Sequence, residues 1–557
     1  MAANVFAVPE LAAMVAQYLP PRDIAACRLT SRAFNNTFNP YLWKHTSVTN
    51  DEDNEWDIFY RASTSEFLYR NRQYIETLSL EIFAAQYLQT LLNTTSADDV
   101  PLAPPAPAQK SAGTPQHPGF PSLKFLSIAV GAIKYYSQLA EKDAVIPDDS
   151  LKILLEEAPN ITSLTLYPEV LENPNFMATL KSGLPHLKTL ILRRASDTYK
   201  PYPIGLVLSA LPILLAKPKL TTLELDFFLK YDPEVSSSTL VGKTMKDLAE
   251  NPRAKLVITS MVFPRTEYGF PLTFVKPMLE TCLPQLQILN VPFLGARDLA
   301  QLVDVVPAHC PNVRELNLSR LRSGSEYPEM IEQVVRLIKS YKDLRAYHGP
   351  AYEEWEDRRA ITQALLEHTN TLESVVLTEE MNSSAFANLL SSMPALRTLV
   401  IIYTFSVDLE GAISRPWAPR HLQRLDMTVQ VKDTTLRFVK SQCLDRDPEF
   451  NPGLLTEKLD DQDFGYMAMR KLFKNIGELT ELEDLYIRHY YNSKWKCEKD
   501  WTLGVGLGFL GGLVKLRKLR LNDGVEYMGQ AEMEFIYKHW PNLEEVDISI
   551  ESKYPSY

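Results

Sequence analysis

Cysteine is scarce in this chain, and its cysteines are too far apart in sequence to act together. The 557 residues include five cysteines, Cys27, Cys282, Cys310, Cys443 and Cys497, and none forms a C-x-x-C motif. Structural zinc sites and disulfide frameworks need closely spaced or paired cysteines. We therefore expect no metal site, no disulfide and a reducing compartment, either cytoplasmic or nuclear.

The chain also lacks a long hydrophobic run and a basic patch. Its most apolar stretch, residues 203–216, contains Pro212 and is shorter than the roughly 20 residues that a membrane-spanning helix needs. The first residues lack the basic and apolar regions of a secretory signal. Because the net charge is −11, we expect neither a membrane protein nor a general nucleic-acid binder.

Common catalytic motifs are missing as well. There is no G-x-S-x-G, no H-E-x-x-H and no P-loop. Gly506-x-Gly508-x-x-Gly511 matches the dinucleotide fingerprint, but no strand leads directly into it, as a pyrophosphate site requires. We interpret these glycines as part of a loosened helical segment, and we expect no catalytic residue and no cofactor.

A short pattern recurs along most of the chain. An apolar residue is followed by two free positions, a second apolar residue, one free position and a third, as in residues 313–318. Because strand side chains alternate between faces, Leu316 and Leu318 are predicted to enter a core. Glu315 and Asn317 then point outward. One such strand buries little by itself, which favours a stacked array of similar units.

The spacing of the pattern allows a helix to return between most strands. Its first apolar position falls at Ile75, Leu123, Ile161, Leu187, Leu220, Leu286, Val313, Leu344, Leu372, Leu396, Leu422, Leu482, Leu516 and Leu543, with Leu344 a weak match. Helical periodicity followed by proline, as in residues 382–394, predicts the returning helices. Each unit is therefore expected to be a strand, a turn and a helix.

Several segments interrupt this regularity. Residues 48–70 are predicted to form a connecting helix, and the proline-rich residues 97–121 a long loop. Insertions are expected near residues 226–270, with a degenerate unit at 256–258, and near 443–465. A further insertion at 488–501 combines basic and aromatic residues. It is either a contact loop or a hairpin whose aromatic side chains pack back onto the array.

From residue 71 to residue 557 the pattern resembles leucine-rich repeats. This resemblance implies an α/β solenoid shaped like a horseshoe, with parallel strands on the concave side and helices on the convex side. The units are longer than the minimal repeat, so the resemblance predicts the class of fold and leaves the curvature open.

Three short helices are predicted ahead of the array. The first begins near Pro9 and is stopped by Pro20 and Pro21, the second begins near Asp23, and Thr30 or Ser31 can cap the third. Their many large apolar residues exceed what so small a core can bury, which favours an interface with a partner. The alternative is a bare cap that seals the end of the array.

These N-terminal residues resemble the F-box, the adaptor-binding motif of ubiquitin-ligase substrate receptors. The resemblance covers residues 4–47. It rests on Pro9-Glu10-Leu11, Tyr18-Leu19-Pro20-Pro21-Arg22-Asp23-Ile24, Cys27-Arg28-Leu29, Arg32, Phe34 and Trp43. Ala12, Ala13 and Thr30 depart from the usual residues of the motif.

Together the two resemblances imply a non-catalytic substrate receptor of an SCF-type cullin-RING ubiquitin ligase, acting in protein degradation. The F-box would bind a Skp1-type adaptor, and through it a cullin, while the repeats hold an unidentified protein substrate. Adaptor contact or its supporting core is expected at Pro9, Leu11, Val15, Leu19, Pro20, Ile24, Leu29 and Trp43. The alternatives are an interaction scaffold outside any ligase and a GTPase-activating regulator, which needs a positioned loop Arg or Asn.

The outward strand positions and the last insertion are the candidate substrate-binding surface. The candidates are Glu224, Asp226, Glu315, Asn317, Tyr486, Arg488, Trp495, Lys518 and Arg520. A ligand on this surface would meet acidic residues in the middle of the chain and basic residues near its end. The alternative is a solvated sheet face without a ligand.

Overall fold

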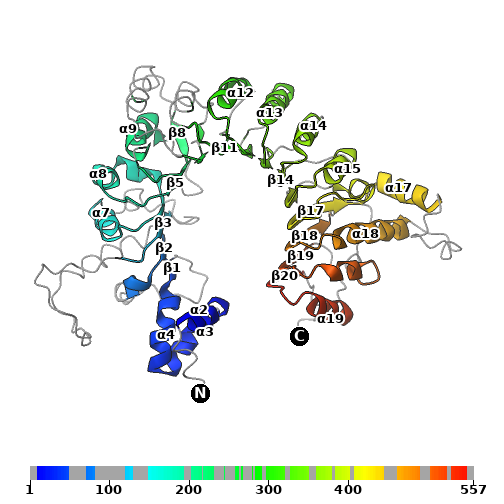
Figure 1. Ribbon diagram of the computed structural model, residues 1–557, viewed down its shortest axis with the longest axis horizontal. Helices are drawn as coiled ribbons and strands as arrows, with labels where there is room; N and C mark the ends of the chain where they lie inside the picture. The colour runs from blue at the N-terminus through cyan, green and yellow to red at the C-terminus, as the bar shows by residue number, and fades with distance from the viewer. Residues whose placement is uncertain are drawn as a thin grey trace, which may run out of the picture. The chain divides into compact units, whose positions relative to one another are not determined.

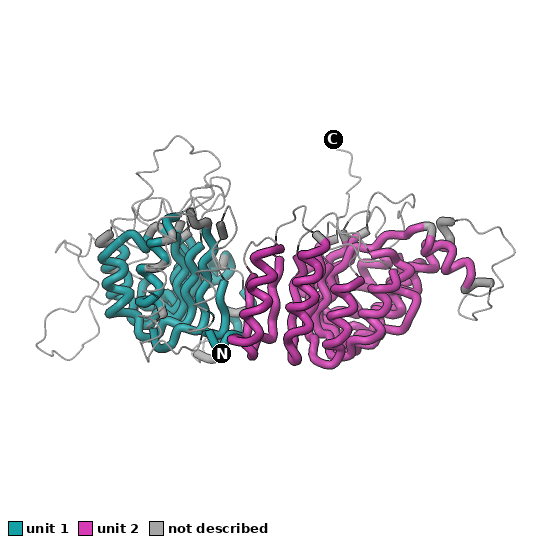
Figure 2. The backbone as a smooth tube through the Cα atoms, turned by 90° about the horizontal axis from the view of Figure 1, so that it is seen from above, with its two compact units in different colours: residues 1–286 teal, residues 287–557 magenta. Residues whose placement is uncertain are grey.

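The chain forms two compact units, residues 1–286 and 287–557 (Figure 2). The computed structural model describes residues 9–19, 21–48, 71–81, 120–129, 148–193, 202–215, 217–230, 244, 258–262, 265–266, 279, 283–291, 296–319, 321, 327–350, 359–378, 383–401, 407–444, 461–489, 502–522 and 529–548. Within these ranges, every helix is too short or too polar to cross a membrane.

Unit 1 begins with three helices, α2 (Pro9–Tyr18), α3 (Pro21–Thr30) and α4 (Arg32–Trp43). Ser31 is the N-cap of α4, where its hydroxyl oxygen accepts a hydrogen bond from the Phe34 amide at 3.2 Å. Ala16, Ile24 and Phe38, one from each helix, form the centre of a small core. The prediction of three N-terminal helices is confirmed.

Helix α4 leads directly into the first strand of the sheet, β1 (His45–Val48). The Lys44 carbonyl accepts hydrogen bonds from the amides of Glu76 and Thr77, at 3.0 Å each. The Glu76 carbonyl accepts from two amides of the following unit in the same way. The repeating hydrogen-bond pattern therefore starts at the end of α4, ahead of the expected start of the array at residue 71.

The sheet of unit 1 is parallel, and its neighbours follow the order of the chain. Its further strands are β2 (Thr77–Glu81), β3 (Phe125–Ala129), β4 (Ser163–Leu166), β5 (Thr189–Arg193), β7 (Thr222–Asp226) and β9 (Ser260–Val262). The returning helices are α7 (Asp148–Glu157), α8 (Pro174–Ser182) and α9 (Ile204–Leu215), with the 3-10 turns η2 (Arg72–Tyr74) and η4 (Pro168–Glu172). These helices cover one face of the sheet (Figure 1).

A second, small sheet in unit 1 is not predicted by the repeat pattern. It consists of β6 (Tyr202–Pro203), β8 (Phe228–Lys230) and β10 (Arg265–Thr266). The buried rings of Tyr202 and Phe227 meet edge to face beside it, with centroids 5.5 Å apart. Strands this short carry no detectable periodicity, which explains why the sequence does not reveal them.

Unit 2 repeats the same construction. Its strands are β11 (Ile288–Asn290), β12 (Glu315–Asn317), β13 (Ala346–His348), β14 (Ser374–Leu377), β15 (Thr398–Ile401), β16 (Val407–Asp408), β17 (Arg424–Gln430), β18 (Asp484–His489), β19 (Lys518–Asn522) and β20 (Glu545–Ile548). All pair in parallel with the next strand of the chain, except that β15 and β16 both pair with β17.

Helices again cover one face of the sheet in unit 2 (Figure 1). They are α12 (Ala296–His309), α13 (Tyr327–Ser340), α14 (Arg359–Leu365), α15 (Ser383–Ser392), α16 (Leu409–Ile413), α17 (Asp433–Leu444), α18 (Asp461–Gly477) and α19 (Gln530–His539), with the 3-10 turns η6 (Leu366–His368) and η8 (Leu507–Gly512). The predicted strand, turn and helix unit is therefore observed in both halves of the chain.

The predicted apolar positions lie in register across the strands. Leu316, for example, pairs with Leu289 on one side and Tyr347 on the other, and all three are fully buried. Tyr347 explains why the unit at Leu344 matches the pattern weakly. The face that carries the alternate, outward positions is opposite the helices, and we call it the open face.

Two irregular places differ from expectation. The degenerate unit expected at residues 256–258 lies slightly later in the chain and contains strand β9. Its first apolar position is the buried Ile258, and Met261 of β9 pairs with Leu223. The glycines at 506–511 belong to a 3-10 turn, with Gly506 at φ 128°. Residues 49–70, 82–119, 445–460 and 490–501 lie outside the described residues, and with them most of the predicted connecting helix, proline-rich loop and insertions.

Cys310, in the first turn after α12, is completely buried, and burial raises the pKa of its thiol to about 12. We expect Cys310 to resist N-ethylmaleimide at pH 8 in the folded protein and to react once denaturant exposes it, because the thiolate is the reactive form. Mass spectrometry of the labelled peptides measures this. Alkylation in native buffer as fast as in denaturant would contradict it.

The raised pKa of the Cys310 thiol predicts how the stability of the protein changes with pH. Its pKa in the folded protein lies above the ordinary value of 9.0. Its contribution to stability is therefore complete below pH 9 and is lost as the pH rises toward 12, where only the unfolded chain ionises readily.

Candidate functional sites

The first candidate site lies on the three N-terminal helices, where α2 exposes its large apolar side chains and buries small ones. On α2, Ala12 and Ala16 are buried, while the larger side chains face solvent. The exposed apolar residues are Leu11, Met14, Val15 and Tyr18 on α2 and Leu29 on α3, with Tyr18 85% and Leu29 89% exposed. We call these five residues the apolar patch. The α2 members follow the spacing i, i+3, i+4, i+7 and therefore share one helix face.

This arrangement is the reverse of what burial alone would favour. A fully buried Leu or Val side chain contributes about 1.5–3 kcal/mol relative to an exposed one, so leaving five large apolar residues in water forgoes stability. Exposed apolar residues gathered on one helix face, as on α2, mark an interaction site. The patch is therefore a candidate docking surface for a protein partner.

The predicted adaptor residues divide into two groups by exposure. Leu11, Val15 and Leu29 belong to the apolar patch. Leu19 packs partly buried against the small core, and Ile24 and Trp43 are buried. Pro9 begins α2, and Pro20 lies outside the described residues.

The buried group supports the helices and does not present a contact surface. The Trp43 indole donates a hydrogen bond to Asn39 Oδ1 at 3.1 Å, and the Asn39 amide donates to Asn71 Oδ1 at 2.8 Å. This chain of hydrogen bonds ties α4 to the turn before β2. Ile24 and Trp43 therefore hold the patch in place, while Met14 and Tyr18 are contact candidates that the sequence did not single out.

The second candidate site is a hollow of about 250 Å³ on the open face of unit 2. Strands β17, β18 and β19 supply its floor. Its polar lining consists of Arg424, Asp426, Asp484, Tyr486, Lys518 and Arg520. We call it the β17–β19 pocket.

Register explains why these residues meet. Arg424, Asp484 and Lys518 lie side by side on the three strands, and so do Asp426, Tyr486 and Arg520. All six occupy outward positions two residues apart on their strands, so they point to the same side. The pocket is therefore a direct product of the repeat pattern.

A buried ion pair anchors one side of the pocket. The Arg488 guanidinium donates to Asp426 Oδ1 at 2.6 Å, and the side chains of both residues are about 10% exposed, at 9% and 11%. Burial raises the pKa of Asp426, although Arg488 and Arg424 act in the opposite direction. Strand β17 is buried on both faces from Leu425 onward, which separates this pair from water.

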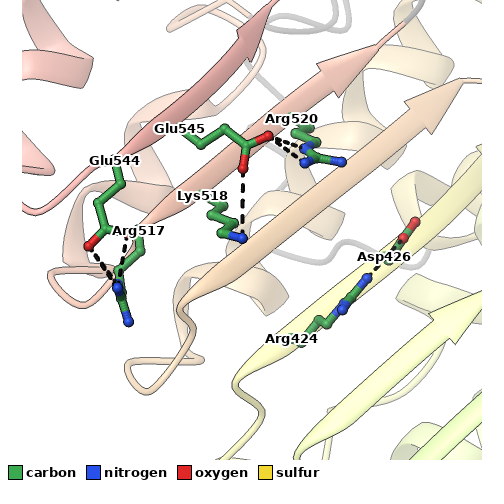
Figure 3. A network of polar contacts seen from close by, with 7 residues as sticks. All are labelled: Arg424, Asp426, Arg517, Lys518, Arg520, Glu544 and Glu545. Atoms are coloured by element: carbon green, nitrogen blue, oxygen red, sulfur yellow. Dashed lines mark hydrogen bonds and ion pairs between the residues drawn. The ribbon is translucent and has the colours of Figure 1, made fainter. Parts of the chain in front are cut away.

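A second, more exposed ion pair lies at the other side (Figure 3). Arg520 donates to Glu545 on β20 through Nε at 3.0 Å and through Nη2, and Lys518 Nζ lies 3.7 Å from the same carboxylate. This hydrogen bonding raises the pKa of Arg520. Glu545 therefore pairs with two cations of the pocket at once and leaves one positive charge among the three groups.

Tyr486 lies between the two ion pairs. The guanidinium carbon of Arg488 lies 3.9 Å from the centroid of its ring, and that of Arg520 lies 5.7 Å away. Both distances are within the range of cation–π attraction. The ring thus helps to fix both guanidinium groups in position.

Four of the remaining predicted substrate residues, Glu224, Asp226, Glu315 and Asn317, do not line this pocket. In unit 1, Glu224 and Asp226 each lie 3.6 Å from a guanidinium nitrogen of Arg193. In unit 2, Asn317 Oδ1 accepts hydrogen bonds from the amide and hydroxyl of Ser319, and Glu315 lies on the same strand, β12. Trp495 lies outside the described residues.

The predicted substrate residues do not include four members of the second site, namely Arg424, Asp426, Asp484 and Glu545. Each occupies an outward position of a recognised unit, so the alternation rule contains the signal. What the sequence does not provide is the order of neighbouring strands across the long insertion that separates β17 from β18.

The described residues thus form a three-helix domain joined to an α/β repeat array, with an apolar docking patch in the first and a charged pocket in the second. Among those residues, no group of three or more His, Cys, Asp or Glu side chains is placed to hold a metal ion.

The N-terminal domain is F-box-like, because a family model with that description matches residues 9–49. No curated protein matches the chain. Among solved structures, one chain of the crystal structure of the Rad7 and Elc1 complex in yeast is similar, with 14% sequence identity and a TM-score of 0.38. That match covers 67% of this chain and 82% of the other.

Proposed function

We propose that this protein is a non-catalytic substrate receptor of an SCF-type ubiquitin ligase, acting in the cytoplasm or nucleus. The F-box-like helices dock a Skp1-type adaptor through the apolar patch, and the adaptor links the chain to a cullin. The open face of the array holds a protein substrate. The observation that carries the proposal is the exposure of Leu11, Met14, Val15, Tyr18 and Leu29 within the segment that matches the F-box-like family.

The contribution of such a receptor is proximity. A substrate held on the array stays close to the conjugating machinery, which raises its effective concentration there without any reacting group in this chain. The chemistry of ubiquitin transfer then belongs to other subunits. The receptor supplies specificity through the side chains on its open face.

The proposal is tested by capture of purified Skp1 on the immobilised full-length chain, followed by addition of a cullin–RING complex. We expect the chain to retain the cullin only when Skp1 is present, because the adaptor bridges the two. Retention of Skp1 without any cullin would indicate a scaffold outside the ligase. No retention of Skp1 would overturn the proposal.

A further inference from the structure

We propose that the β17–β19 pocket binds an anionic side chain of an extended peptide, and that Glu545, beside the pocket, competes for two of its cations until the peptide arrives. The inference deepens the proposed function and rests on it for the identity of the ligand as a segment of a protein substrate. The pocket itself is defined by its own geometry.

The size of the hollow favours a side chain over a cofactor. Its volume of about 250 Å³ lies below the roughly 300–1,000 Å³ of typical small-molecule sites. It lies on an open sheet face, along which an extended peptide can run with alternate side chains pointing down. One such side chain fills a hollow of this size.

The charges in and around the pocket favour an anion. Three cations, Arg424, Lys518 and Arg520, line the pocket together with two carboxylates, Asp426 and Asp484. Glu545 and Asp547 of β20 act on Arg520 from outside the lining. Asp426 is already held by the buried Arg488 at 2.6 Å. Among the lining residues the cations therefore exceed the carboxylates by one, and one of those carboxylates is already paired.

Arg424 is the cation best placed to receive a ligand. Its side chain is 51% exposed, and within the described part of the chain its ion-pair contact is with Asp426 at 3.9 Å, beyond hydrogen-bond distance. A planar guanidinium with donors to spare matches a carboxylate or phosphate in bidentate geometry. Arg424 therefore offers a contact that needs no existing bond to break.

Arg520 and Lys518 can bind a ligand anion only if that anion replaces Glu545 as their partner. Their shared partner Glu545 is 40% exposed, and exposed ion pairs contribute little stability, so a ligand anion can replace it at small cost. Tyr486 holds the Arg520 guanidinium near the pocket during this exchange. Removing the Glu545 charge should consequently strengthen binding, whereas removing Arg520 should weaken it.

The neighbouring pair Arg517–Glu544 provides a matched control (Figure 3). Arg517 donates to Glu544 from Nε at 3.0 Å and from Nη2 at 2.7 Å, the same chemistry as Arg520 with Glu545. Arg520 lines the pocket, whereas neither Arg517 nor Glu544 does. Glu544→Gln changes the net charge of the protein as Glu545→Gln does, and leaves the pocket intact.

The experiment measures retention of three fluorescent, degenerate decapeptide libraries by the full chain, with Glu, phosphoserine or Lys fixed at the centre. We expect the Glu or phosphoserine library to bind better than the Lys library. Arg424→Gln and Arg520→Gln should each weaken that binding at least about tenfold. Glu545→Gln should strengthen it roughly threefold or more, and Glu544→Gln should leave it unchanged.

Each outcome decides the proposal. Stronger binding of phosphoserine than of Glu identifies a phosphate as the anion, and equal binding identifies a carboxylate. Equal retention of the Lys library, or equal effects of Glu545→Gln and Glu544→Gln, would overturn the inference. Skp1 capture on the same preparations separates the two proposals, because peptide selectivity without Skp1 capture rejects only the ligase function.

Discussion

Replacing Leu29 by aspartate is expected to weaken Skp1 binding by about 2 kcal/mol or more, roughly 30-fold, while the protein stays folded. Leu29 is 89% exposed, so the substitution removes no core contact. In a complex the new carboxylate would be buried against an apolar surface, which is costly for an unpaired charge. Val15→Asp should act in the same direction from α2. Titration calorimetry with purified Skp1 measures both affinities.

Two further variants distinguish residues that contact the adaptor from residues that only stabilise the fold. Tyr537→Asp introduces the same charge at a 73% exposed aromatic residue on α19, and it should leave Skp1 binding unchanged. Ile24→Ala removes a buried core residue and should lower the free energy of unfolding by about 2–5 kcal/mol without changing the affinity of the molecules that remain folded. If Leu29→Asp bound Skp1 as well as the native chain, the apolar patch would not be the adaptor surface.

Replacing Arg488 by methionine is expected to lower the free energy of unfolding of unit 2 by about 3–5 kcal/mol. Methionine keeps much of the apolar volume but leaves the Asp426 carboxylate buried without its 2.6 Å partner. Chemical denaturation followed by tryptophan fluorescence measures the change. A shift below 1 kcal/mol would show that water reaches this pair in the folded protein.

Arg517→Met is the matched control for this substitution, because it breaks an ion pair whose side chains are 52% and 55% exposed. Exposed pairs contribute about 0–1 kcal/mol, so the control should have little effect. The double variant Arg488→Met, Asp426→Asn should recover part of the loss, since no buried charge remains.

The pH dependence of Arg488→Met follows from the direction of the Asp426 shift. Burial raises the pKa of Asp426 even with Arg488 present, and removing Arg488 takes away an opposing influence. A carboxyl whose folded pKa is raised contributes most to stability below its unfolded pKa, and that contribution is lost as the pH rises through the folded value. The variant should therefore lie closer to the native protein in stability at pH 4 than at pH 8.

The repeat pattern predicts most of the array because the buried apolar positions within each unit are sufficient to identify its strand. Leu164, Leu223 and Leu399 lie where the pattern places them, completely buried and in register with their neighbours. The short strands β1, β6 and β16 escape because they do not carry the recurring pattern of three apolar positions, and the buried position of β1, for example, is Thr46. Their positions depend on neighbouring strands that offer free hydrogen-bonding edges.

The candidate sites are only partly predictable from the sequence, because packing decides which side chains are exposed and which charges pair. Tyr18 and Ala16 are both apolar residues of one helix, and only packing decides that Ala16 is inside and Tyr18 outside. Likewise Arg520 stands out as an outward cation, whereas its partner Glu545 lies 25 residues later on the next strand. Which charge neutralises which is a property of the assembled sheet.

Because α4 leads directly into β1, truncating the chain at this junction affects both the helices and the sheet. A cut after residue 47 would remove most of β1 and leave the β2 edge without its hydrogen-bonded neighbour. Open strand edges promote aggregation, so a shortened array would lose solubility together with the adaptor surface. The N-terminal helices and the first strand of the sheet are therefore not separable domains that can be exchanged between proteins. Point substitutions are the better way to abolish the function of either one.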